Sequence, residues 1–151
     1  MIRTVAAETE EDYHIKPIEI NVPNETERKG LVTSRVGQGA YRKSILFRWQ
    51  FKCAVTGYSK PNVLIASHIV PWKESTNDER LDINNGILLS PTFDALFDRK
   101  LISFENNGKI ILTDAMLKSN YEKIGITGKE IIKDLNRENI QYLERHRSLL
   151  S

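Results

Sequence analysis

Two short apolar segments separated by a polar stretch stand near the middle of the chain. The first covers residues 63–70, the second covers residues 87–89, and the charged loop 73–83 lies between them. Apolar runs of this length are typical of buried strands. Pro71 lacks an amide hydrogen and should end the first strand, and the Asn85-Gly86 turn should open the second. The pattern therefore predicts strand, loop and strand.

A helix start follows the second strand directly. Ser90 is a residue type favoured at N-caps, and Pro91 suits the first helical position. The predicted helix covers residues 92–98. Strand, loop, strand and helix together predict a ββα finger with its core motif in residues 63–100.

Residues 38–50 have a helical pattern. Tyr41, Ile45 and Trp49 recur at four-residue spacing and should share one apolar face. The pattern predicts an amphipathic helix that covers the finger, and its basic residues could also touch a nucleic-acid backbone.

The remaining predicted elements flank this finger. Residues 101–104 and 109–112 surround Glu105-Asn106-Asn107-Gly108, which predicts a β-hairpin. Asp114 is expected to cap a helix that continues through Tyr121. A second helix is expected over residues 137–150, with Ile140, Leu143 and Leu150 facing the core and Arg145 and Arg147 facing outward. The predicted fold class is α+β.

The chain of 151 residues suits one ordinary domain. We divide it into an N-terminal arm or linker, residues 1–30, and a main domain, residues 31–151. An alternating segment at residues 14–23 could form an edge strand, because Pro17 and Pro23 exclude a central position. A separate recognition domain upstream of the arm would be compatible with this arrangement.

The composition narrows the classes of protein. No apolar run is long enough for a membrane span, and the first residues lack the pattern of a signal peptide, so we expect a cytoplasmic protein with no membrane partner. Cys53 is the only cysteine, which excludes an internal disulfide and a zinc site of paired cysteines. We therefore expect no structural zinc, and a buried apolar role for Cys53.

Positive charge is concentrated in the middle of the chain. Residues 30–100 carry ten basic and six acidic side chains, whereas residues 1–29 carry four basic and seven acidic ones. A basic surface around the finger would favour a phosphate-bearing partner.

The motifs of the finger resemble those of the HNH endonucleases. The likeness lies in Ser67-His68-Ile69-Val70-Pro71-Trp72, in Asn85-Gly86-Ile87-Leu88-Leu89 and in Asp94-Ala95-Leu96-Phe97-Asp98-Arg99. The resemblance implies a ββα-metal fold, with His68 as the first H, Asn85 as the N, and Asp94 in the place of the last H. It also implies cleavage of DNA, in restriction or another form of defence.

His68 is the candidate general base, because an imidazole can take a proton from water near neutral pH. By resemblance, Asn85 ties the loop between the strands and helps to fix that base; the alternative is a plain Asn-Gly turn. Ser67 departs from family members that place a metal ligand before the histidine.

Asp94 and Asp98 are four residues apart on the predicted helix, so both carboxylates can reach one ion. Carboxylate oxygens favour Mg²⁺ or Mn²⁺ over zinc. Asp98 could instead form a salt bridge or a helix cap. Trp72 could stack on DNA or pack behind the strand. Candidate phosphate contacts are Arg99, Lys100, Lys73, Arg80 and Arg42.

The sequence thus predicts a metal-dependent endonuclease that hydrolyses DNA phosphodiesters. Cutting both strands would need two copies of the site, which makes a homodimer a candidate assembly. Two alternatives stay open: a DNA-binding module with a degenerate, non-cleaving site, and a metal-binding scaffold for protein partners.

Overall fold

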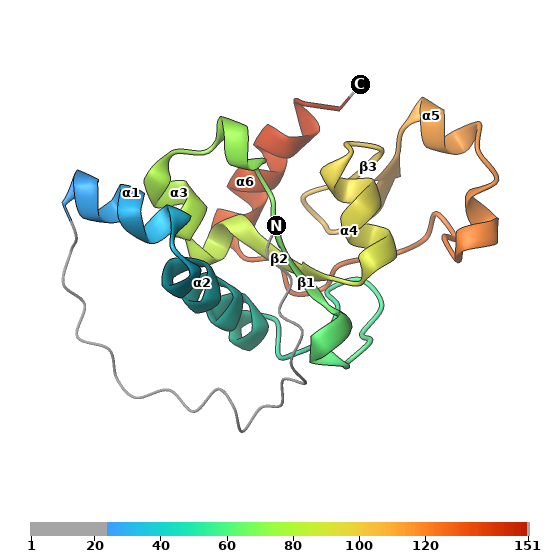
Figure 1. Ribbon diagram of the computed structural model, residues 1–151. Helices are drawn as coiled ribbons and strands as arrows, with labels where there is room; N and C mark the ends of the chain where they lie inside the picture. Colours follow the sequence, from blue (N-terminus) through green and yellow to red (C-terminus); the bar gives the residue numbers. More distant parts are fainter. Residues whose placement is uncertain (1–23, 151) are drawn as a thin grey trace.

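The structure, a computed structural model, describes residues 24–150. Figure 1 shows an α+β arrangement in which helices surround two small antiparallel strand pairs. The α-helices and strands in chain order are α1 (Glu25–Thr33), α2 (Arg35–Arg48), β1 (Ile65–His68), α3 (Asn77–Leu81), β2 (Gly86–Leu89), α4 (Pro91–Asp98), β3 (Ile102–Phe104), β4 (Ile110–Leu112), α5 (Asp114–Leu117) and α6 (Arg137–Arg147).

The predicted ββα finger is confirmed. β1 pairs antiparallel with β2, from Ile65 opposite Leu89 to His68 opposite Gly86, and α4 follows directly. Pro91 is the first helical residue, as predicted. Ser90 occupies the N-cap position, but its side chain makes no capping hydrogen bond. Figure 1 shows this strand pair at the centre of the molecule, with α2 and α4 beside it.

The apolar face predicted for α2 is also confirmed. Tyr41, Ile45 and Trp49 are all buried, and the Trp49 indole N–H donates to the Gly86 carbonyl (3.0 Å). A Cβ atom on Gly86 would lie 2.2 Å from Ile45 Cδ1 and 2.5 Å from the Tyr41 hydroxyl. Only glycine therefore lets β2 approach α2 so closely.

The hairpin after the finger is confirmed, with Ile102 of β3 opposite Leu112 of β4. The helix expected from Asp114 to Tyr121 ends earlier, at Leu117, and Thr113 rather than Asp114 is its N-cap. The charged loop 73–83 is more ordered than expected, because it contains the 3₁₀ turn Trp72–Glu74 and helix α3. A capping box of Thr76 and Glu79 begins α3, a local signal that the pattern of apolar residues does not show.

The C-terminal helix differs in detail from its prediction. α6 ends at Arg147, and Leu143 is buried as expected, whereas Ile140 and Leu150 are half-buried. Arg147 does not simply face outward, because its guanidinium donates to the Phe104 carbonyl (2.8 Å).

The predicted arm and domain boundary stay predictions. The alternating segment 14–23 lies outside the described residues. Helix α1 crosses residue 30, begins with a capping box at Asn24, and is joined to α3 by the Arg28–Asp78 ion pair. Within residues 24–150, no helix is long and apolar enough to cross a membrane.

Candidate functional site

His68 lies at the last position of β1, where the chain leaves the sheet. Its Nε2 is 2.9 Å from the backbone carbonyl of Arg80. A carbonyl can only accept, so Nε2 must carry the hydrogen. In the neutral ring the lone pair is therefore on Nδ1, for which no partner occurs in the described part of the chain. This arrangement fixes the tautomer that a general base needs.

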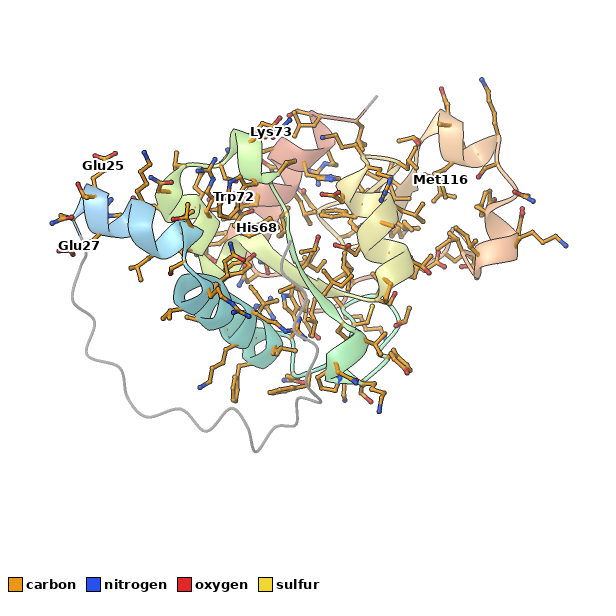
Figure 2. All side chains as sticks on the ribbon, viewed as in Figure 1. Glu25, Glu27, His68, Trp72, Lys73 and Met116 are labelled. Carbon is orange, nitrogen blue, oxygen red and sulfur yellow. The ribbon has the colours of Figure 1, made fainter. Side chains whose placement is uncertain are left out.

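Two aromatic rings enclose the imidazole. The Tyr41 ring stacks on it with a centroid distance of 4.3 Å and an interplanar angle of 5°. The Trp72 ring meets it edge-on at 5.7 Å, and Figure 2 shows the two labelled side chains close together. Burial lowers the pKa of His68 below 6.5, opposed by the Arg80 carbonyl and assisted by the Arg80 charge. The ring is therefore uncharged at pH 7, and its Nδ1 can accept a proton.

Tyr41 connects this stack to β2. Its hydroxyl donates to the Asn85 carbonyl (2.8 Å). Burial, with the nearby Asp82 and Tyr142, raises the pKa of Tyr41 well above 10, so the phenol keeps its proton and its donor function.

Asn85 is fully buried and makes three side-chain hydrogen bonds. Its Oδ1 accepts from the Val70 amide (2.9 Å), and its Nδ2 donates to Ser75 Oγ (3.3 Å) and to the Glu79 carbonyl (3.0 Å). These bonds join the end of β1 to α3, the helix that presents the Arg80 carbonyl to His68. An Asn-Gly turn alone would not need them. The catalytic role assigned to Asn85 stays a prediction.

Arg80 contributes more to the site than its charge. Its guanidinium donates twice to the Trp72 carbonyl (2.9 and 2.7 Å) and lies 4.6 Å from the centroid of the Trp72 ring. Trp72 is still 38% exposed. The side chain that we expected on a phosphate thus holds the turn after β1, beside the imidazole.

The two predicted metal ligands lie on α4, Asp94 half-buried and Asp98 exposed. No group of three or more His, Cys, Asp or Glu side chains suited to one metal ion occurs among residues 24–150. His68, against Tyr41 of α2, and the two aspartates of α4 therefore do not form such a group. Mg²⁺ usually takes only one or two carboxylates and fills its shell with water and phosphate, so a pair of aspartates would be enough to hold it. The metal role of both aspartates stays a prediction.

The other predicted nucleic-acid contacts fall into two classes. Arg42 donates to the Leu64 and Pro61 carbonyls, both at 2.9 Å, and so holds the segment before β1. Lys73 and Arg99 are exposed. The roles of all three residues stay predictions, but Lys73 and Arg99 are the two whose side chains are open to a phosphate.

Cys53 is buried and free, as expected. Its Sγ lies 3.4 Å from the amide nitrogens of Thr56 and Ser90, which brings the turn before β1 to the start of α4.

Sequence reasoning missed the Tyr41 stack and the Arg80 carbonyl. Helical periodicity placed Tyr41 on the buried face of α2, but could not identify its neighbour there. Every residue has a backbone carbonyl, so the residue type gives no sign of this acceptor. The only available signal was the position of Arg80 in the last turn of α3, where carbonyls lack partners within the helix.

Comparison with known proteins adds one finding. Residues 53–105 match the family model of the HNH endonucleases. No curated protein matches the chain. The matched segment includes His68, Asn85, Asp94 and Asp98, and the fold agrees with an HNH ββα unit.

Proposed function

We propose that this chain, through its HNH-matching segment 53–105, is a metal-dependent endonuclease that hydrolyses phosphodiester bonds of DNA. One observation carries the proposal. His68 donates Nε2–H to a backbone carbonyl, so its Nδ1 keeps a lone pair, in a ring that burial keeps neutral. That is the state in which an imidazole can accept a proton from water.

Hydrolysis would use the described residues as follows. Nδ1 of His68 takes a proton from a water molecule while the water oxygen bonds to phosphorus and the bond to the departing sugar oxygen breaks. The Arg80 carbonyl stabilises the resulting imidazolium through Nε2–H, and the stacked Tyr41 ring holds the imidazole in its orientation. A divalent ion held by Asp94 and Asp98 would neutralise charge on the phosphate and on the departing oxygen.

Exposed basic side chains suit a DNA partner. Lys73 follows Trp72 on the turn beside His68, and Arg99 follows Asp98 at the end of α4. Each could contact a backbone phosphate without reading sequence. A role in restriction or another form of defence is supported by the resemblance of the motifs. The homodimer and the cytoplasmic location stay predictions from the sequence.

Nicking of supercoiled plasmid tests the proposal. With Mg²⁺ or Mn²⁺ we expect nicked product, and with excess chelator we expect none. His68→Gln should remove the activity, because a glutamine amide can still donate to the Arg80 carbonyl but has no basic lone pair. Full activity in His68→Gln would overturn the base assignment.

The pH dependence gives an independent check on the same assay. Because the pKa of His68 is lowered, the neutral base persists below pH 6.5. We expect the nicking rate to fall only when the pH drops below 6.5. A midpoint above pH 6.5 would show that another group controls the rate.

A second candidate function is a DNA-binding module that does not cleave. It is favoured by the lack of a group of three metal-binding side chains within the described range 24–150. Salt-sensitive DNA binding without metal-dependent nicking of several substrates would identify this alternative.

A further inference from the structure

α6 lies outside the segment that matches the HNH endonucleases, yet its polar face contacts the loop that fixes His68. The Tyr142 hydroxyl donates to Asp82 Oδ2 (2.7 Å). Burial and this bond raise the pKa of Tyr142, so the phenol keeps its proton. Asp82 in turn accepts from the Asn84 amide at Oδ1 (2.9 Å) and from the Asn85 amide at its carbonyl (3.0 Å).

The start of α6 holds the neighbouring residue. Asn139 is fully buried, and its Nδ2 donates to the Asn84 carbonyl (2.7 Å). Asn136 Nδ2 donates to Asn84 Oδ1 (3.0 Å). Asn139 Oδ1 also accepts from Arg48 of α2 (2.8 Å). The residue before Asn85 is therefore joined to α6 by two bonds, and α6 is itself joined to α2.

The end of α6 holds α3. Arg145 forms an ion pair with the Glu79 carboxylate and donates to the Glu74 carbonyl (3.0 Å). The Glu79 carbonyl is one of the acceptors of Asn85, and the next carbonyl along, that of Arg80, accepts from His68. Helix α6 thus binds both ends of the segment 74–84, which carries the Arg80 carbonyl that accepts from His68.

The need for this support follows from the length of α3. A helix of five residues is not stable by itself in water. Arg80 is in its last turn, where carbonyls have no partner within the helix and are free to accept from a side chain. The position of that carbonyl depends on whatever holds α3 against the molecule.

We infer that α6 positions the general base, and that Tyr142 is a positioning residue that acts through Asp82 and the loop ending at Asn85. That His68 acts as a base rests on the proposed function. The geometric claim, that α6 sets the orientation and tautomer of His68, stands without it.

Tyr142→Phe tests the claim, because it removes only the hydroxyl that binds Asp82. Tyr121→Phe is the matched control: Tyr121 is half-buried against the core, and its hydroxyl has no hydrogen-bond partner in the part of the chain that the structure describes. Nitrogen-15 NMR of the imidazole, without DNA, reports which ring nitrogen of His68 is protonated and the pKa of the ring. The groups that face this ring are Tyr41 of α2, Trp72 and Arg80, and neither variant changes them.

In Tyr142→Phe we expect the Nε2–H tautomer of His68 to lose its dominance and the pKa of His68 to rise toward 6.5. The single-turnover nicking rate should fall about tenfold, as is typical when a partner that orients a functional side chain is lost. DNA affinity should be unchanged, and Tyr121→Phe should resemble the unaltered protein in all three measurements.

An unchanged tautomer and pKa of His68 in Tyr142→Phe, with only a lower melting temperature, would overturn the inference. If Tyr142→Phe does not fold, Asp82→Asn weakens the same bond from the other side, and the same two outcomes apply. The NMR measurement does not depend on cleavage. A chain that never nicks DNA but releases His68 in Tyr142→Phe would refute the proposed function and leave the inference intact.

Discussion

Two imidazoles in separate regions of the molecule, the half-buried His68 and the buried His146, are held in nearly the same way. His68 stacks on Tyr41 and donates from Nε2 to the Arg80 carbonyl. His146 of α6 stacks on Phe97 with a centroid distance of 3.9 Å and an angle of 8°, and its Nε2 lies 3.0 Å from the Phe97 carbonyl. Both rings therefore have the Nε2–H tautomer when neutral.

The difference lies at the other nitrogen. Nδ1 of His146 is 2.8 Å from the Ser103 hydroxyl, and the ring is only 1% exposed. Nδ1 of His68 has no such bond within residues 24–150, and its ring is half-buried. His146 thus has both nitrogens occupied and serves to pack α6 on α4 and β3. One nitrogen left open is what makes the His68 region suited to chemistry.

The largest expected effect breaks the His68 region at its support. Asn85→Asp would remove the two donors to Ser75 and Glu79 and place a carboxylate in a fully buried position. We expect a loss of about 3 to 4 kcal/mol in the free energy of unfolding. Urea unfolding at pH 7 measures it. A simple Asn-Gly turn would instead tolerate aspartate, and a loss below about 1 kcal/mol would support that interpretation.

An intermediate effect separates the two histidines by pH. Burial lowers the pKa of His146 from 6.5 to about 4, so the folded state binds fewer protons than the unfolded state between these values. The contribution of neutral His146 to the free energy of unfolding is therefore fully present above pH 6.5. It is lost as the pH falls toward 4, by about 2 to 3 kcal/mol. Urea unfolding at pH 7 and pH 4.5 would record the decrease.

The matched variants for that measurement are His146→Gln and His68→Gln. The lowered pKa of His68 has the same sign of effect, but His146 has the deeper site. We therefore expect His146→Gln to flatten the pH dependence and His68→Gln to leave most of it. Equal flattening by both variants would remove the distinction between the two regions.

The smallest expected effect concerns the exposed basic residues near the finger. Arg99→Gln and Lys73→Gln should each weaken DNA binding uniformly across sequences and reduce the salt dependence by about one phosphate contact. Filter binding at several salt concentrations measures this slope. Lys118→Gln, an exposed change beyond α5, is the control. Variants that alter sequence preference instead would show that these side chains read bases.

Local patterns in the sequence were sufficient to predict the finger, α2 and the hairpin. The periodicity of Tyr41, Ile45 and Trp49, and the turn and cap signals around Gly86 and Pro91, act within a few residues, and the structure follows them. The predicted bounds of α5 and α6 were less accurate, because the ends of helices depend on tertiary contacts as well as on local signals.

The connections between the two regions were not predictable in this way. Tyr142 and Asp82 are 60 positions apart, and His146 and Phe97 are 49 positions apart. Nothing in the spacing of one sequence marks such pairs. No spacing in the sequence marks His146 either, and its burial follows from the packing of α6. The proposed metal site is a similar case, because Asp94 and Asp98 are neighbours by helical spacing whereas a third ligand would have to come from elsewhere.

Chemical rescue of His68→Ala is the most direct test of the central claim, that the open nitrogen of His68 takes a proton from water. This change would leave a space between the rings of Tyr41 and Trp72 into which free imidazole could enter. In plasmid nicking with Mn²⁺, we expect a rate at least about a hundredfold below that of the unaltered protein, with partial recovery as imidazole is added. Nicking by His68→Ala at the rate of the unaltered protein, without imidazole, would contradict the account.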